Sequence, residues 1–283
     1  MTVAKAFDHT RYRARRGRNL LVLSLAIAST GLGLLVLAAI LLDLVWEGAA
    51  ALGPSLFVNS MPNGLANAIV GSILLTFFGA LFGTPVGIMA GTYIAEYSRG
   101  SRFAQVVQFI NDVLLSAPSI VIGLFIAEVM VVQSRHFSGW AGSVALGIIV
   151  VPVVVRTTVD MLGLVPNTLR EAAAALGTPK WKIVTMVCYR AAGQGMLTGI
   201  MLAVARISGE TAPLLFTAFG DDKLKWNMNE PISSLPLAIN TFVIEGTPES
   251  SRLAWGGALL ITVTILSLNI TARSLANAGS SKR

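Results

Sequence analysis

The chain has 283 residues, of which 54% are hydrophobic and only 12% are charged, and its formal net charge is +7. Soluble domains carry about 25% charged residues, and a soluble core could not bury this much apolar surface. An ordinary soluble domain is therefore excluded, and part of the surface must face lipid. The single cysteine, Cys188, excludes an intrachain disulfide, and His9 and His136 are too far apart in sequence to indicate a metal site.

Six apolar runs are long enough to cross a bilayer, so we predict an all-α, polytopic membrane protein with six transmembrane helices. The first run is too long for the apolar part of a secretory signal, which has about 7–15 residues. A basic tail, 1–19, precedes it, the main transmembrane domain is 65–272, and a short tail, 273–283, ends the chain. In chain order the predicted helices cover residues 20–45, 65–95, 104–132, 140–155, 191–219 and 253–272.

Basic residues are distributed unevenly between the segments that connect these helices. With the N-terminus inside, 16 of the 21 lysines and arginines lie in segments on the inner side. The positive-inside rule then places both ends of the chain in the cytoplasm. It also places a coupling segment, 166–190, in the cytoplasm and a long loop, 220–252, outside. Contact with the membrane lipid explains the positive charge, and no nucleic-acid partner is predicted.

The predicted cytoplasmic segment reads as two short helices. Thr168, followed three residues later by Glu171, fits a capping box that would start the first helix. The alanines that follow favour a helix, and Gly177 is suited to end it in the left-handed conformation. Thr178 and Pro179 then fit the N-cap and the first position of the second helix.

Two interpretations of this segment are open from the residues alone. Lys180, Trp181 and Lys182 could hold an amphipathic helix on the inner leaflet, with the charges facing lipid headgroups. Alternatively, the exposed turn is a docking surface for a soluble partner. A chain that is mostly membrane has little other reason to keep such a segment.

Two charges fall inside the fifth predicted helix. Arg206 lies about 24 Å along the helix from Arg190, near the middle of a membrane about 30 Å thick. Glu210 follows one turn later on the same face. An arginine at this depth costs at least about 2.5–3.5 kcal/mol, so it should face a cavity or a partner. The pair could merely neutralise itself, or Arg206 could offer its planar fork of donors to an oxyanion that crosses the membrane.

The remaining charges have simpler interpretations. Asp112 and Glu128, both in the third predicted helix, are expected to snorkel or to pair with another helix. Arg156 is expected to anchor its helix at the membrane interface. The run S-S-L-P-L-A-I-N in the loop 220–252 predicts a short lid or docking helix.

Two sequence patterns resemble a known family. Glu171, Ala172 and Ala173, with Gly177 four residues further on, are similar to the EAA loop of type I ABC-importer permeases, although the Leu-Pro that usually follows is missing here. The run A-R-I-S-G-E-T-A-P-L-L-F at 205–216 resembles the penultimate helix of the PstA family of phosphate-importer permeases. The resemblance extends from about residue 60 to residue 272.

This resemblance implies a type I permease core in a bacterial inner membrane, with both termini cytoplasmic. The EAA loop would be a coupling helix that sits in a groove of an ATPase. The implied partners are a second, PstC-like permease, two PstB-like ATPases and an extracytoplasmic PstS-like phosphate-binding protein. It further implies that Arg206 and Glu210 take part in phosphate passage.

The chain is predicted to be a transport subunit and not an enzyme. It has no G-x-x-x-x-G-K-[ST] phosphate loop, so ATP and Mg²⁺ would be bound by the partner ATPases. Permeation of another oxyanion, such as molybdate or sulfate, is the nearest alternative. An ion-coupled secondary transporter, with Asp112 or Glu128 on the coupling ion, and a scaffold without a conduit are the alternatives from other classes.

Overall fold

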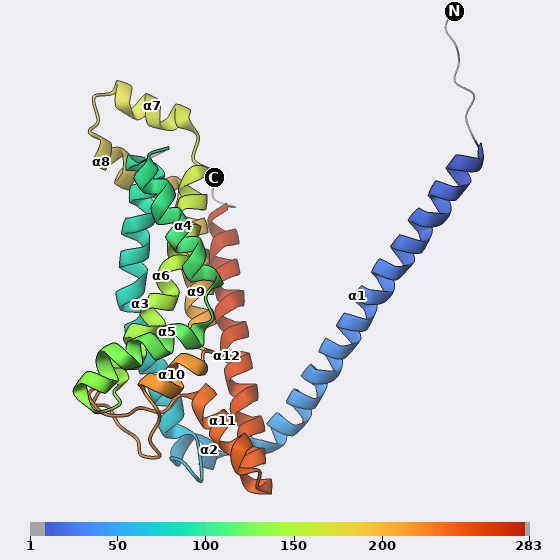
Figure 1. The fold of residues 1–283 in the computed structure, drawn as a ribbon, viewed down its shortest axis with the longest axis vertical. Coiled ribbons are helices and arrows are strands. Elements are labelled where there is room, and N and C mark those ends of the chain that lie inside the picture. The colour runs from blue at the N-terminus through green and yellow to red at the C-terminus, as the bar shows by residue number, and fades with distance from the viewer. Residues whose placement is uncertain (1–8, 99, 281–283) are drawn as a thin grey trace, which may run out of the picture.

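The computed structural model describes residues 9–98 and 100–280, and every regular element in them is helical, as predicted. Most of the helices form one bundle, with α7 and α8 at one end and α2 and α11 at the other (Figure 1). The elements, of which η1 to η3 are π-helical turns, are α1 (His9–Ala51), α2 (Pro54–Val58), α3 (Ala66–Thr92), η1 (Tyr93–Tyr97), α4 (Arg102–Ser116), α5 (Ser119–Ile126), η2 (Ala127–Val132), α6 (Gly139–Gly163), α7 (Asn167–Ala175), α8 (Lys180–Lys182), η3 (Ile183–Cys188), α9 (Tyr189–Ile207), α10 (Ala212–Thr217), α11 (Leu235–Glu245) and α12 (Pro248–Ser280).

Four helices in the described residues are long and apolar enough to cross a membrane: Arg15–Ala51, Ala66–Tyr97, Gly139–Gly163 and Pro248–Ser274. A bent pair of helices, Arg102–Ser116 and Ser119–Val132, supplies a fifth crossing if it is one span. Of the six predicted spans, the first, second, fourth and last thus correspond to continuous helices. The third and the fifth do not.

The third predicted span, 104–132, is broken near its middle. α4 ends at Ser116, and the chain bends by 101° before the next helix continues. Ala117 is extended, with φ −66° and ψ 135°, because the ring of Pro118 excludes the helical conformation for the residue before it. The prediction of one continuous helix was wrong here, since the apolar run continues through a residue pair that the α-helix does not accept.

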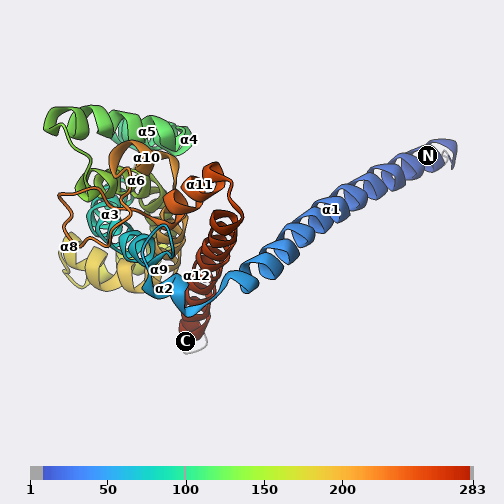
Figure 2. The same cartoon turned by 90° about the horizontal axis from the view of Figure 1, so that it is seen from below.

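The fifth predicted span, 191–219, is also interrupted. α9 ends at Ile207, and the short helix α10 begins four residues after Ser208, with Pro213 in its first turn. α10 packs against α5: a Cβ atom on Gly123 would lie 2.5 Å from Cα of Pro213. Figure 2 shows α4 and α5 along one side of the bundle with α10 next to α5. The two interruptions therefore lie close together in space.

The centre of the bundle is the tightly packed pair of α3 and α6. Glycines every four residues along α3 let its backbone approach α6, and a Cβ atom on Gly83 would lie 2.5 Å from the carbonyl oxygen of Gly147. Small residues at such spacing allow helix backbones to approach closely in membranes. Four glycines of α3 lie against α6 in this way: Gly79, Gly83, Gly87 and Gly91.

Helix α1 differs from the others because it leaves the bundle (Figures 1 and 2). None of its most apolar stretch is buried. It touches α12 only near its C-terminal end, where a Cβ atom on Gly48 would lie 2.6 Å from Cβ of Leu259. Arg252 also donates a hydrogen bond to the Ala50 carbonyl oxygen over 2.9 Å.

Candidate functional site

The turn between α7 and α8 ends the bundle on one side. Gly177 has φ +73°, the left-handed conformation that the sequence predicts for it. The Gly177 N–H donates to the Ala174 carbonyl over 2.9 Å, and the Thr178 N–H donates to the Ala173 carbonyl over 3.3 Å. These two bonds form a Schellman motif, which satisfies carbonyls that the helix end leaves free. The predicted turn at Gly177 is confirmed.

The predicted helix starts on both sides of this turn are wrong. α7 begins after Pro166, and no side-chain hydrogen bond caps it, so Thr168 and Glu171 do not form a capping box. α8 likewise has Pro179 as its N-cap, with no side-chain bond from Thr178. Both helices start directly after a proline in the extended conformation, Pro166 with ψ 141° and Pro179 with ψ 149°. The side chains of Thr168 and Thr178 therefore cap neither helix.

The outer surface of this turn is exposed. No residue of α7 is buried, and Leu176, beside the turn, is 85% exposed. Glu171 and Ala172 are also exposed, whereas Ala173 is half-buried. The outer side of the turn is therefore accessible to a partner.

The two lysines of α8 contact aromatic rings. The Lys180 ammonium lies 4.9 Å from the ring centroid of Tyr97, the last residue of η1. Lys182 lies 5.4 Å from the ring centroid of its neighbour Trp181. Cation–π contacts of this kind hold a lysine against a surface without neutralising it.

An ion pair with one buried and one largely buried side chain attaches α7 to the end of α3. Arg170 on α7 and Glu96 in η1 have side chains that are only 14% and 4% exposed, and they form a salt bridge. Arg170 Nε donates to both carboxylate oxygens, over 3.2 and 3.1 Å. The hydrogen bond to Glu96 raises the pKa of Arg170 above its usual value, so the guanidinium stays charged.

Sequence reasoning missed this pair. The predicted second span ends at Ala95, one residue before Glu96, and Arg170 was read only as part of a basic segment. A signal was present, because a carboxylate directly at the end of a long uncharged run must find a partner or water. Nothing in the sequence shows that the partner is 74 residues away.

Arg206 and Glu210 lie at the interruption between α9 and α10. Arg206 is in the last turn of α9, and Glu210 is in the turn that follows. Arg206 Nε and Glu210 Oε1 are 4.0 Å apart, and the two side chains are 52% and 16% exposed. This distance exceeds that of a hydrogen bond. Among the described residues no side-chain hydrogen bond of Arg206 is found, so its donors are available.

The break between α4 and α5 lies directly beside Arg206. Arg206 lines a small hollow together with Ala117, at the break after α4, and Ser119, the first residue of α5. On the other side of the hollow is Pro152, near the middle of α6. The N-terminus of a helix carries a partial positive charge. The start of α5 and the Arg206 guanidinium thus place positive potential at one point of the bundle.

One turn further along α6, Arg156 forms two ion pairs. Its Nη1 is 3.6 Å from Asp112 Oδ1 on α4, and its Nε is 3.1 Å from Asp160 Oδ2 on α6. Asp112 is therefore an interhelical partner, as predicted. The helix end predicted at residue 155 is wrong, because α6 continues through Arg156 to Gly163. The role of Arg156 as an anchor at the membrane interface stays a prediction. Glu128 is exposed in η2.

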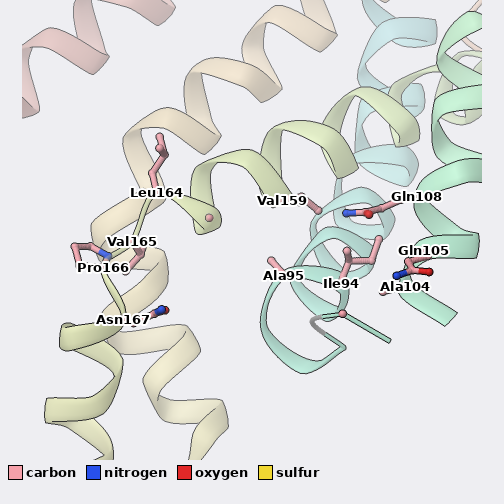
Figure 3. A pocket seen from close by; sticks show the side chains of 12 residues that line it. Ile94, Ala95, Ala104, Gln105, Gln108, Val159, Leu164, Val165, Pro166 and Asn167 are labelled. Carbon is pink, nitrogen blue, oxygen red and sulfur yellow. The ribbon is translucent and has the colours of Figure 1, made fainter. Parts of the chain in front are cut away.

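A larger cavity of about 580 Å³ opens next to these groups, between η1, α4 and the connection from α6 to α7. Figure 3 shows Gln105 and Gln108 of α4 on one side of it and Asn167 of α7 on the other. Among the residues that the structure describes, its lining contains no charged side chain, and the amides of the two glutamines and Asn167 can hold water or a neutral polar group.

The loop 220–252 is ordered against the end of the bundle opposite α7. The N–H groups of Gly139 and Trp140 donate to the carbonyls of Glu230 and Met228, both over 3.0 Å. Lys225 Nζ lies 2.9 Å from Asp221 Oδ2 and 2.7 Å from Glu230 Oε2. Trp226 and Asp222 are exposed. The run with Pro236 forms α11, so the short helix predicted there is confirmed.

Comparisons with known proteins match this architecture. Residues 83–279 match the family model described as the binding-protein-dependent transport system inner membrane component. The phosphate transport system permease protein PstA of Haemophilus influenzae is 52% identical over 274 residues, which is 95% of this chain and 97% of that protein. The chain belongs to the PstA branch of this family.

A second PstA relative and a solved structure agree with this assignment. PstA of Pasteurella multocida is 52% identical and covers 94% of this chain and 97% of its own length. A chain in the crystal structure of a bacterial ABC transporter involved in the import of alginate superposes with a TM-score of 0.68. The match covers 95% of this PstA-branch chain and 99% of that chain at 14% identity, which supports the fold alone.

Proposed function

We propose that this chain is the permease subunit of an ATP-driven importer of inorganic phosphate and forms half of the translocation path. The observation that carries this proposal is the near-complete match to phosphate transport permeases over the length of the chain. This match favours phosphate over molybdate or sulfate. Membership of a binding-protein-dependent family favours an ATP-driven importer over a secondary transporter or a scaffold.

Arg206 is proposed to contact phosphate in the membrane. Arg206, in the last turn of α9, is half exposed and lines a hollow with Pro152 of α6. Its guanidinium donors are not used by other side chains of the described residues. A guanidinium matches two phosphate oxygens at once. Glu210, 4.0 Å away, lowers the local positive potential, so that the anion can leave.

The proposed orientation puts the α7–α8 end and both termini in the cytoplasm. Its support is the excess of lysine and arginine in the segments that would lie there. The loop 220–252 with α11 then faces outward and is the proposed contact for a phosphate-binding protein.

The exposed turn at Gly177 is proposed to dock on an ATPase. Glu171 and Ala172 are exposed before it, Ala173 packs inward, and Gly177 fixes its direction. The chain itself has no phosphate loop, so ATP and Mg²⁺ are proposed to bind to two PstB-like ATPase subunits. A PstC-like permease would complete the path, and a PstS-like protein would deliver phosphate.

The test is reconstitution of the chain with these partners in vesicles and measurement of phosphate uptake. Uptake that requires ATP, the ATPases and the binding protein is expected, with sulfate and molybdate transported far more slowly. Uptake that persists without the ATPase subunits would contradict the proposal. Equal rates for sulfate or molybdate would contradict only the assignment of phosphate as the substrate.

A further inference from the structure

The attachment of α7 to the rest of the bundle is narrow. No residue of α7 is buried, and Ala173 is its one partly buried apolar residue packed on the cluster around Ala95, Leu162 and Cys188. The Arg170 side chain is the other attachment. A helix held by so little apolar contact depends on its polar bonds for its position.

Arg170 makes bonds to several segments at once. Besides both oxygens of Glu96, it donates to the carbonyl oxygens of Leu162, over 2.7 Å, and Val165, near the end of α6. It also donates to the side chain of Asn167 over 3.3 Å. Only the planar fork of arginine reaches this many acceptors, and a lysine ammonium does not.

Glu96 is the fixed end of this connection. It lies in η1, which continues α3 without a break, and its side chain is almost fully buried. α3 is in turn packed on α6 through its row of glycines. A displacement of Glu96 therefore moves α3 and α6 together, because close-packed helices transmit displacement with little deformation.

Two routes lead from the Gly177 turn into the membrane part. One follows the chain, because Lys180 to Ile207 is a continuous helix through α8, η3 and α9 that ends beside Arg206. The other passes through Arg170 to Glu96 and reaches α3 and α6. Since α9 packs against α6, the first route also acts on α6. With that route alone, however, α7 itself would be held only by the chain and by Ala173, so a pull on the turn would move α7 relative to α3 and α6.

We propose that the Arg170–Glu96 ion pair is a coupling link, which makes α7 and the α3–α6 pair move as one body when the ATPase moves the Gly177 turn. The two residues act as positioning residues, since neither touches the proposed phosphate path. This proposal rests on the proposed docking of an ATPase at that turn.

The test uses the reconstituted complex and measures phosphate imported per ATP hydrolysed. Glu96→Gln removes the charge at nearly unchanged shape, and Arg170→Lys keeps the charge but loses the fork. We expect the ratio to fall about tenfold in Glu96→Gln and less in Arg170→Lys, while ATP hydrolysis continues. Arg102→Gln is the matched control, an exposed cation just after η1, and should leave the ratio unchanged.

A double variant separates coupling from folding. A buried ion pair can often be replaced by apolar residues of similar size without loss of stability, so Glu96→Leu with Arg170→Met should assemble normally. We expect this complex to hydrolyse ATP and to show the same low transport ratio. An unchanged ratio in the double variant, or a loss of transport that only follows the amount of assembled complex, would overturn the proposal.

A distance measurement tests the link without phosphate. Spin labels at Ala174→Cys on α7 and Tyr93→Cys on η1 report their separation, and the native Cys188 is buried and stays unlabelled. With the ion pair intact, ATP should not change this distance, whereas the apolar double variant should show a shift or a broader distribution. Identical distributions in both would overturn the link. A complex that imports no phosphate but keeps the invariant distance would overturn only the proposed substrate.

Discussion

Two arginines of this chain lie near a glutamate, and their surroundings are opposite. Arg170 is 14% exposed, and its donors are taken up by Glu96 and by three further acceptors. Arg206 is 52% exposed, with its glutamate 4.0 Å away. A guanidinium whose donors are all satisfied holds protein segments in place. A guanidinium with free donors inside a membrane domain is able to bind an anion.

The difference shows that hydrogen bonds, and not spacing in the sequence, distinguish a structural Arg–Glu pair in a membrane protein from one that can bind a ligand. In sequence the i,i+4 pair of Arg206 and Glu210 looks like the self-neutralised one. The pair that is neutralised by direct hydrogen bonds joins residues 74 positions apart. Four experiments test this comparison, in order of decreasing expected effect.

Removal of the Arg206 charge should have the largest effect. In Arg206→Gln, phosphate uptake by the assembled complex should fall about a hundredfold or more, because a bidentate, charge-assisted contact is lost in a region of low dielectric constant. Arg206→Lys should retain an intermediate rate. Uptake assays with labelled phosphate at matched protein levels measure this, and full-rate uptake by Arg206→Gln would remove Arg206 from the path.

The α3–α6 pair, to which Arg170 attaches α7, should lose stability when the two helices are forced apart. Gly83→Ala introduces a Cβ atom 2.5 Å from the Gly147 carbonyl oxygen, and overpacking of this kind costs about 1–3 kcal/mol. We expect a lower thermal unfolding midpoint in detergent. Gly163→Ala, where nothing lies within 4 Å, is the control and should keep the wild-type midpoint. Equal midpoints for both variants would contradict the close packing of this pair.

The turn that Arg170 positions depends on Gly177. Gly177→Leu forces a branched side chain into φ +73° at a cost of about 1–2 kcal/mol, and we expect fewer phosphate ions imported per ATP. Gly100→Leu imposes the same strain, also with open space around it, but outside the turn. A ratio that falls equally in both variants would show that strain, and not the position of the turn, is responsible.

The exposed ion cluster of the loop should show the smallest effect. Burial raises the pKa of Asp221, but hydrogen bonds from the Lys223 N–H and from Lys225 outweigh it, so the pKa lies below its usual value. The hydrogen bond from Lys225 likewise lowers the pKa of Glu230. Both carboxylates therefore stabilise the folded loop above their ordinary pKa values of 3.8 and 4.5, and this contribution is lost as pH falls through the lowered values.

Amide hydrogen exchange of residues 220–230, corrected for the intrinsic rate, measures this loss. Protection should decrease slightly between about pH 6 and about pH 3, and most of the decrease should fall below the ordinary pKa values of the two carboxyl groups. The variant Lys225→Met should have lower protection at the higher pH and a weaker dependence on pH. The same pH dependence in the variant would show that other groups are responsible.

The sequence was sufficient where one residue type determines the local conformation. Gly177, followed by Thr178 and Pro179, predicts the left-handed turn, and no other residue type fits that conformation as well. Long uncharged runs likewise predict the helices that contain residues 20–45, 66–95 and 140–155. The resemblance then identified the family from residues 205–216.

The sequence was insufficient where the position of a helix end or a side chain depends on contacts between distant segments. The break at Pro118 was readable, because the residue before a proline avoids the helix, but the apolar run outweighed that signal. Ser208 and Gly209, which directly follow the end of α9 at Ile207, are also a turn signal, and there too the apolar run outweighed it. The pairing of Glu96 with Arg170 requires the fold of α3, α6 and α7 together, which no local pattern contains.

The attachment of helix α1 at one end only has a consequence for which parts of the chain depend on each other. Its contacts with the bundle are confined to its last turns, near Gly48 and Ala50, and all the interactions of Arg170 and Arg206 involve residues after Gly64. A helix joined at one end is a modular attachment. Its sequence can change, provided that it stays apolar, without altering the geometry of either arginine. The proposed conduit and the proposed coupling link thus rest on residues after Gly64, and the first helix is joined to that part at its C-terminal end.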